Sequence, residues 1–419
     1  MTTPVAVTAG TAPGRRHDID ALRAIAFGLL ILYHVGMFYV PWDWHVKSVH
    51  IAPWLETPML LLNQWRMPLV FMVSGLAVNF LLGEGTNPRI GYAAFAGLRI
   101  RRLLWPLVFG MLLVVPPQAY YEALRHGAAE PAYLSFLWRY FTFQSWPDGA
   151  FAGSDIGITW NHLWYLPYLL LYTLTLAVLL SGMARPMDLL RRTIRRLRGL
   201  WLVLVPVALL MPIGIWIFPR FPYISHDLIT DGYAHAMYGT FFVFGYLIGR
   251  DPGLWAEMAR LRWRTLGLAS VAFATLLGLG EISIDAPDQP FDTVLTFVVY
   301  LNRWTWLLVV LGWGHRLLNR PMAWLNYANR AVYPWYVLHQ TLIVMAGVWL
   351  SELALGPVLE PLALIIATVG GCAGIMVLAE RWVPGLGTGI GLKRASTRAL
   401  GRQARATNPG GRTPAPSTE

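Results

Sequence analysis

The chain has 419 residues, of which 56% are hydrophobic and 13% charged, with a formal net charge of +11. About a quarter of the residues in a soluble domain are charged, so this composition excludes an ordinary soluble protein and indicates a membrane protein. A binding site for nucleic acid would require a basic face on a soluble domain. Here the arginines are spread over short connections between apolar runs, so we expect a lipid bilayer and no nucleic acid as partner.

Apolar runs recur along the chain with lengths near the roughly 20 residues that a helix needs to cross a bilayer. We expect about ten such spans, and their centres lie near residues 31, 70, 110, 171, 208, 241, 272, 304, 340 and 369. The sequence thus predicts an all-α polytopic membrane protein with a transmembrane domain over residues 17–385. Residues 1–16 and 386–419 are polar, and we predict that they are disordered cytoplasmic tails, the second of them basic.

Arginines concentrate in the connections that follow the second, fourth, sixth and eighth runs. The positive-inside rule places these connections, and therefore both termini, in the cytoplasm. The first run has no small-residue cleavage site and is predicted to act as its own signal anchor. Cys372 is the single cysteine of the chain and so has no partner for an internal disulfide.

The first run carries two ionisable residues, Arg23 and His34. They are eleven residues apart, about three helical turns, so they project from nearly the same face about 16 Å apart. An ionisable group deep in a membrane is costly and usually functional, which favours a functional role for His34 over a structural one. Arg23 lies near the cytoplasmic boundary, where an arginine that extends to the lipid headgroups is an equally good interpretation.

The second run contains Arg66, too deep to reach either headgroup region. Left unpaired, its charge would cost at least about 3 kcal/mol, so we expect it to meet an anion, a group of carbonyls or water. A carboxylate on a substrate would suit it, and a structural partner is the alternative. Arg303, in YLNRWTWLL, raises the same question. Ser74 and Gly75 further along the second run are typical of close helix packing.

Three further segments place polar groups at the ends or the middle of spans. Arg99, Arg101 and Arg102 begin the third span and are a topology signal as well as candidate phosphate ligands. The segment HLWYL, which starts at His162, opens the fourth span at the outer surface, where aromatic residues commonly anchor. The segment YPWYVLHQT, which starts at Tyr333, carries two polar neighbours to the middle of the membrane, where both require partners.

The longest outward connection, over residues 118–161, includes the aromatic stretch YLSFLWRYFTFQSWPDG. It is a candidate lid or acceptor platform, and an ordinary aromatic belt at the membrane interface is an equal alternative. We find no internal repeat, which disfavours a secondary transporter. No zinc, P-loop, dinucleotide or nucleophile-elbow motif occurs in a plausible context, so we expect no metal and no bound cofactor.

Taken together, these residues resemble the acyltransferase family 3 of bacterial membrane enzymes. Its signature is an arginine, ten residues and a histidine in the first span, here Arg23 and His34. The segment FMVSG, Phe71 to Gly75, and the entry RIRRLLWP to the third span also match, and the similarity extends through nearly all ten spans. The resemblance implies a ten-helix fold in the bacterial cytoplasmic (inner) membrane. It also implies transfer of an acyl group from cytoplasmic acyl-CoA to a hydroxyl of an extracytoplasmic sugar.

Within that family the chain is most similar to the members that succinylate osmoregulated periplasmic glucans. The matches are WHVKS at Trp44 to Ser48, the Arg66-Met67 pair, HLWYL, and GHRLLN at Gly314 to Asn319. FMVSG replaces a more aromatic segment, and YPWYVLHQT resembles members with no assigned substrate. The resemblance therefore implies succinyl-CoA as donor, with acetyl-CoA as the alternative, and a periplasmic glucan as acceptor.

The spacing and the resemblance lead to one mechanistic hypothesis. Arg23, Arg101 and Arg102 would hold the CoA phosphates, and neutral His34 would take the proton of the glycan hydroxyl that attacks the thioester, an effect typically worth about 10² to 10⁴ in rate. A covalent acyl-histidine is the other route. Asp20 lies about 21 Å away along the helix, so it cannot orient His34, and the sequence identifies no residue that does.

We predict that the remaining polar and aromatic candidates bind the acyl group or the acceptor. They are Arg66, Ser74, His162, Trp164, Tyr165, Arg303, Tyr333, His339 and Gln340. Three other functions stay open: an O-acetyltransferase for another envelope polysaccharide or a secreted small molecule, a glycan transporter or flippase, and a membrane scaffold without catalysis. The oligomeric state is not predicted.

Overall fold

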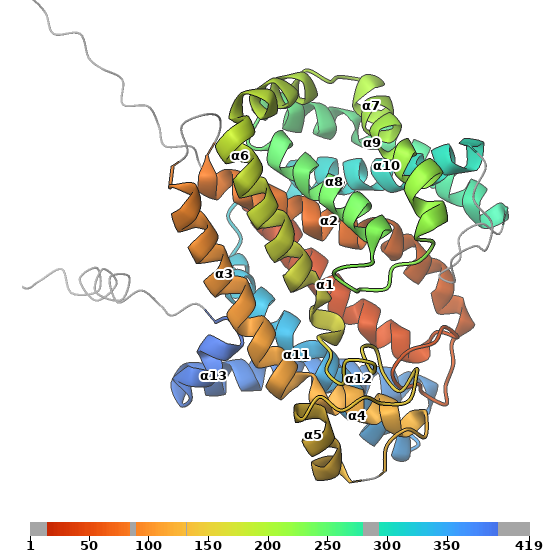
Figure 1. Cartoon of the computed structure of the whole chain (residues 1–419). Coiled ribbons are helices and arrows are strands. Elements are labelled where there is room, and N and C mark those ends of the chain that lie inside the picture. Colours follow the sequence, from red (N-terminus) through yellow and green to blue (C-terminus); the bar gives the residue numbers. More distant parts are fainter. Residues whose placement is uncertain (1–14, 84–88, 131, 280–292, 393–419) are drawn as a thin grey trace, which may run out of the picture.

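A computed structural model describes residues 15–83, 89–130, 132–279 and 293–392, and every secondary-structure element that these residues form is a helix. Most are long helices, joined by short 3₁₀ or π-helical turns labelled η (Figure 1). In chain order they are α1 (His17–Tyr39), η1 (Pro53–Leu55), α2 (Glu56–Leu82), α3 (Tyr92–Phe109), η2 (Gly110–Val114), α4 (Pro116–Arg125), α5 (Tyr133–Phe141), η3 (Asn161–Trp164), α6 (Tyr165–Arg195), α7 (Trp201–Pro212), η4 (Ile213–Ile217), η5 (Phe218–Arg220), α8 (Gly232–Ile248), α9 (Pro252–Gly278), α10 (Thr293–Leu318), α11 (Leu325–Glu352), α12 (Gly356–Arg381) and α13 (Pro384–Gly389).

The described residues include 6 helical segments that are long and apolar enough to cross a membrane. They are His17–Tyr39, Pro53–Leu82, Asn161–Arg195, Trp201–Arg220, Thr293–Leu318 and Gly356–Arg381. The other predicted spans fall on α3 with η2, on α8, on α9 and on α11, so each run predicted from the sequence lies on helical structure. The multi-pass helical fold is thus confirmed, while the number of ten spans and the cytoplasmic termini stay predictions.

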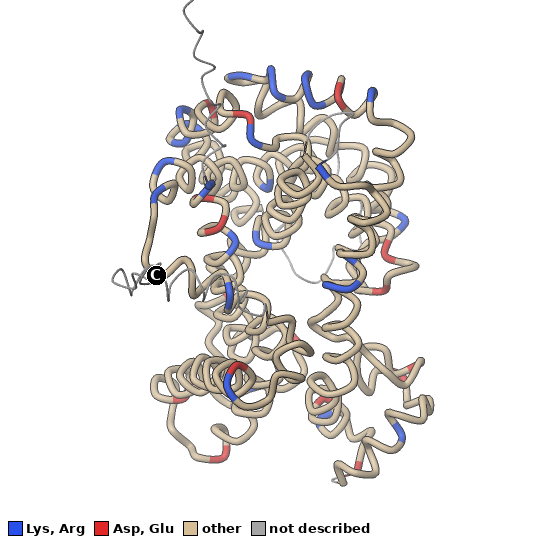
Figure 2. Tube along the Cα trace, turned by 90° about the vertical axis from the view of Figure 1, so that its left-hand side faces the viewer, with Lys and Arg blue, Asp and Glu red and all other residues tan. Residues whose placement is uncertain are grey.

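Helix α1 contacts several other long helices of the bundle. It packs against α2, α10 and α11, and the pairs α2–α8, α9–α10, α3–α6 and α11–α12 complete the bundle. Figure 1 shows α4 and α5 at the end of the molecule opposite the connection between α6 and α7. In Figure 2, Lys and Arg are more frequent toward the upper end of the molecule than at the lower end.

The crossing of α2 and α8 brings two backbones into contact. A Cβ atom added to Gly75 would lie 1.9 Å from the carbonyl oxygen of Phe242, and one added to Gly245 would lie 1.9 Å from that of Met72. Small residues allow this approach, and membrane helices associate largely through such close packing. The close packing predicted for the Ser74-Gly75 pair is therefore confirmed at Gly75.

We expect Gly75→Ala to lower the free energy of unfolding by about 1 to 3 kcal/mol, because the added methyl group must push two rigid backbones apart. Thermal unfolding of the detergent-purified protein measures the effect. Gly267→Ala on α9 is the matched control, since a Cβ there meets nothing within 4 Å. Equal unfolding temperatures for the two variants would contradict a tight α2–α8 crossing.

Part of the predicted C-terminal tail is ordered. Residues 384–389 form α13 and Ile390 is buried, so helical structure extends past the predicted boundary at residue 386. The reason is local packing, because a Cβ on Gly389 would lie 2.4 Å from the ring of Phe109 in α3. The rest of that tail, from residue 393, and residues 1–14 of the N-terminal tail lie outside the described residues.

Candidate active site

A cavity of about 1120 Å³ opens among α1, α2, α6, α8, α10 and α11. Connections at residues 43–45, 152–160 and 222–229 also line it, so the last part of the segment 118–161 borders the cavity. The structure brings seven predicted site residues together on its wall. They are His34, Arg66, His162, Trp164, Tyr165, Arg303 and Gln340.

His34 is held by a second histidine. Its Nδ1 lies 2.8 Å from Nε2 of His339, and Nδ1 of His339 lies 2.8 Å from the carbonyl oxygen of Tyr336. A carbonyl only accepts hydrogen bonds, so His339 carries its proton on Nδ1, and in the neutral ring Nε2 is an acceptor. His34 must then donate from Nδ1. The network therefore leaves Nε2 of His34 with a lone pair that no described residue occupies, in a ring that lines the cavity.

His339 has a different place from the one predicted. Its side chain is completely buried behind His34, with the two rings 5.0 Å apart and nearly parallel. That position suits a residue that orients the imidazole of His34 better than one that binds an acyl group or an acceptor. The Trp44 ring is also nearly parallel to that of His34, with ring centres 6.4 Å apart. The two neighbours fix the plane of the His34 ring.

Arg66 is a buried cation without an acidic partner among the described residues. Its exposed fraction is 6%, and its guanidinium lies 3.4 Å from the centre of the Tyr33 ring. Nε and Nη1 are buried and form no hydrogen bond within the part of the chain that the structure describes. Because Arg66 lines the cavity, these donors are available to an anion that enters it.

Arg303 lines another part of the wall and is better satisfied. Its Nη1 donates to the hydroxyl of Tyr233 at 3.1 Å and contacts the sulfur of Met237 at 2.6 Å. Nearby, Trp164 stacks on His226 with ring centres 4.3 Å apart. His226 therefore extends an aromatic surface with Trp164.

His162 lines the cavity, but the protein occupies both of its ring nitrogens. Nε2 faces the carbonyl oxygen of Val337 at 3.1 Å, so it carries the proton, and Nδ1 accepts from the amide of Gln118 at 3.2 Å. The same Gln118 amide donates to Thr341 at 2.5 Å. His162 thus presents a ring edge to the cavity, with no free nitrogen for proton transfer.

The cavity floor is a triad of aromatic rings from three helices. Phe27 lies 6.3 Å from Tyr165 and 5.5 Å from Tyr336, and the two tyrosines are 5.9 Å apart. The Tyr165 hydroxyl pairs with Ser74 Oγ at 2.5 Å, which places predicted residue Ser74 at this floor. Phe27 lies between Arg23 and His34 on the same face of α1. The floor therefore separates the cavity from the Arg23 end of that face.

Below the floor lies a group of three arginines. Arg23 donates to Asn329 Oδ1 at 2.5 Å and pairs with Asp20 at 3.4 Å. The charges of Arg99 and Arg102 interact with each other, and Arg102 also interacts with Arg23. Arg23 also lines a smaller pocket of about 180 Å³.

Two of the predicted residues lie differently in this region. Arg101 follows Arg99 by two residues and points from another face of α3, whereas Arg102 follows Arg99 by three and shares its face. Of the three arginines that begin α3, Arg99 and Arg102 therefore join Arg23 in this group. The Tyr333 hydroxyl donates to the carbonyl oxygen of Arg102 at 3.2 Å, so Tyr333 belongs with the arginines below the floor.

The sequence did not identify several residues of this site, notably His45, Glu122, Asn161 and Phe27. His45 lies in WHVKS, a segment that the sequence marks only by its resemblance to family members. Other residues of this segment also contact α1. Trp44 stacks on His34, and Lys47 donates to the carbonyl oxygen of Met37 at 2.6 Å near the end of α1. Burial lowers the pKa of Lys47 to about 8.

Comparison with known proteins gives one family and one group of relatives. Residues 16–379 match the acyltransferase domain of the acyltransferase-3 family. Proteins named glucans biosynthesis protein C from Escherichia coli strains K12 and SMS-3-5 are each 25% identical over 349 residues, which cover 80% of this chain and 84% of theirs. No solved structure matches the chain. Since the family match covers most of the chain and includes the whole candidate site, this protein belongs to the acyltransferase-3 family and is a multi-pass membrane acyltransferase.

Proposed function

We propose that this acyltransferase moves a succinyl group from cytoplasmic succinyl-CoA to a hydroxyl of a periplasmic glucan in the bacterial inner membrane. The observation that carries the proposal is the His34–His339 pair, which leaves the Nε2 lone pair of His34 on the wall of a cavity large enough for a sugar. That lone pair can take the proton of a hydroxyl or attack the thioester carbon. Both routes place His34 at the reacting atoms.

The donor would approach along the face of α1 that carries Arg23 and His34. Arg23, Arg99 and Arg102 are grouped as a phosphate site requires, because guanidinium groups form charge-assisted hydrogen bonds to phosphate. About 16 Å of helix separates this group from His34, a distance that the pantetheine arm would bridge past Phe27. The aromatic floor then has to open during each turnover.

Arg66 supports a succinyl donor. A succinyl group ends in a carboxylate, which would satisfy the buried Nε and Nη1 donors of Arg66, whereas an acetyl group offers no anion. Acetyl transfer to another envelope polysaccharide or a secreted small molecule is the second candidate, because the His34–His339 pair suits any acyl thioester. The names of the relatives and the Trp164–His226 stack support a glucan acceptor.

The experiment that tests the function uses purified protein, succinyl-CoA and a β-glucan acceptor. We expect free CoA thiol and succinylated glucan to appear together. A transporter or flippase would move substrate without releasing thiol, and a scaffold would do neither. Mass spectrometry of periplasmic glycans from cells with and without the gene identifies the natural acyl group and acceptor.

Arg99→Ala is expected to raise the KM for the CoA donor by about 10-fold or more, because it removes a charge-assisted contact to phosphate. Arg101→Ala is the matched control, since it deletes the same charge on another face of α3, and its KM should stay within about twofold. Initial rates at varied donor concentration measure both values. A larger effect for Arg101 than for Arg99 would contradict the proposed phosphate site.

A further inference from the structure

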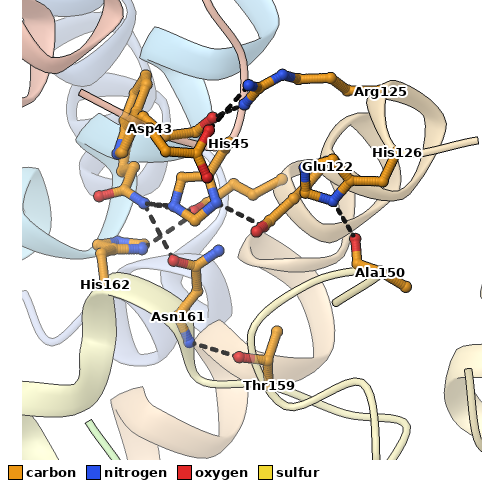
Figure 3. Close-up of polar contacts among 12 residues, drawn as sticks. Asp43, His45, Glu122, Arg125, His126, Ala150, Thr159, Asn161 and His162 are labelled. Carbon is orange, nitrogen blue, oxygen red and sulfur yellow. Dashed lines mark hydrogen bonds and ion pairs between the residues drawn. The ribbon is translucent and has the colours of Figure 1, made fainter. Parts of the chain in front are cut away.

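A second imidazole in the cavity is paired with a carboxylate. His45 Nδ1 lies 2.5 Å from Glu122 Oε2, and both side chains are 12% exposed. Figure 3 shows the pair, with His45 from the connection after α1 and Glu122 from α4. A carboxylate accepts hydrogen bonds, so Nδ1 of His45 carries the proton and Nε2 carries the lone pair. Both residues line the same cavity as His34.

Gln340 leaves the lone pair of His45 only partly occupied. Its amide nitrogen is near three acceptors, His45 Nε2 at 2.9 Å, Gln118 Oε1 at 3.1 Å and Asn161 Oδ1 at 3.1 Å, but it has two protons. The Gln118 side-chain amide cannot be flipped to exchange its oxygen and nitrogen, because its nitrogen donates to His162 and Thr341. One Gln340 proton is therefore shared between His45 and Asn161. An incoming hydroxyl can bond to His45 while Gln340 turns fully to Asn161.

Asn161 supplies a free donor beside this acceptor. Its backbone has φ of +44°, in the left-handed region that Asn tolerates better than most residues. Its Nδ2 is buried and forms no hydrogen bond among the described residues, and Asn161 lines the cavity. A sugar presents both a hydroxyl proton and oxygen acceptors. His45 Nε2 and Asn161 Nδ2 therefore match one carbohydrate unit as acceptor and donor.

The two histidines differ in their ability to hold a proton. A proton on Nε2 of His34 would meet other imidazoles and the charge of Arg66, and the His339 relay ends on a backbone carbonyl. A proton on Nε2 of His45 would make an imidazolium that bonds directly to the Glu122 carboxylate. Opposite charges at hydrogen-bond distance attract strongly in a partly buried site. His45 thus has a carboxylate in contact that can stabilise a transferred proton, whereas the His34–His339 relay ends on a carbonyl and leaves His34 a lone pair suited to attack.

We infer that acyl transfer proceeds in two steps, with an acyl-His34 intermediate and with His45–Glu122 as the base for the acceptor. The inference rests on the proposed function. In the first step Nε2 of His34 bonds to the thioester carbon, the C–S bond breaks, and CoA leaves as thiolate, which takes a proton from cytoplasmic water. In the second step the acceptor oxygen attacks the acyl carbon and its proton moves to His45. The C–N bond then breaks, its electron pair returns to His34, and His45 releases its proton to outer water.

An exchange reaction tests this division of work. Labelled CoA is added to the purified protein and unlabelled succinyl-CoA, without acceptor. A two-step enzyme moves label into succinyl-CoA, because the first step reverses on its own, even when little acyl-enzyme accumulates. We expect exchange by the wild-type protein and none by His34→Ala. Glu122→Gln and His45→Gln should keep exchange within about twofold and lose about 10² of transfer to the glucan.

The controls separate this inference from the proposed function. His126 follows α4, and its ring nitrogen bonds to the carbonyl oxygen of Ala150. The control variant His126→Gln should retain the wild-type rates of both exchange and transfer. If the wild-type protein transfers the acyl group to glucan but catalyses no exchange without acceptor, the two-step route is wrong and the proposed function still stands. If Glu122→Gln loses exchange and transfer equally, the role of His45–Glu122 in the second step is wrong, and the proposed function again stands. Wild-type protein that catalyses neither reaction with succinyl-CoA or acetyl-CoA would overturn the proposed function itself.

Discussion

Replacing His34 with alanine is expected to reduce acyl transfer at least about 10³-fold, because the substitution removes the lone pair that faces the cavity. Thiol release with donor and acceptor present measures the loss. The thermal unfolding temperature should change little, since His34 is only partly buried and Trp44 keeps its other contacts. Transfer at the wild-type rate in this variant would exclude His34 from the chemistry.

His339 acts through His34, so its variants should show graded effects. His339→Leu cannot accept the Nδ1 proton of His34, and we expect a loss of about 10²-fold in kcat. His339→Asn offers a carbonyl oxygen at the end of a shorter side chain and should recover part of that loss. A merely structural histidine would not distinguish these two substitutions at equal stability, so equal kcat values for Leu and Asn would contradict the orienting role.

Arg66→Met is expected to change donor selectivity more than any other substitution in the cavity. Removing one partner of a buried, hydrogen-bonded charge pair costs about 2 to 5 kcal/mol, so kcat/KM for succinyl-CoA should fall about 10²-fold or more. The value for acetyl-CoA should change only a few-fold, because an acetyl group has no carboxylate for Arg66 to bind. Side-by-side rates with the two donors give the ratio.

Arg303→Met is the matched comparison, since Arg303 lines the same cavity but already bonds to Tyr233. It should affect both donors to a similar extent. If Arg66→Met leaves succinyl transfer untouched and lowers only the unfolding temperature, Arg66 has a structural role. In that case its buried donors are satisfied by water or by the Tyr33 ring, and the preference for succinyl loses its main support.

The sequence determined the features that depend on local periodicity and composition. Long apolar runs must satisfy their backbone groups internally in a bilayer, so they predict helices wherever they occur. Arg23 and His34 share a face because eleven residues are about three turns of any α-helix. The buried depth of Arg66 also followed from its position in one run, and the structure leaves it without an acidic partner among the described residues.

Only the tertiary structure decided which helices meet and how each is turned about its axis. His34 and His339 are 305 residues apart, so their contact depends on the packing of α1 against α11. His45 and Glu122 meet through a connection and a short helix whose positions no periodic pattern encodes. The packing of α3 likewise decides which of Arg99, Arg101 and Arg102 lie near Arg23. The sequence shows which residues of a helix share a face. Which of its faces packs against the bundle depends on the side chains of the neighbouring helices.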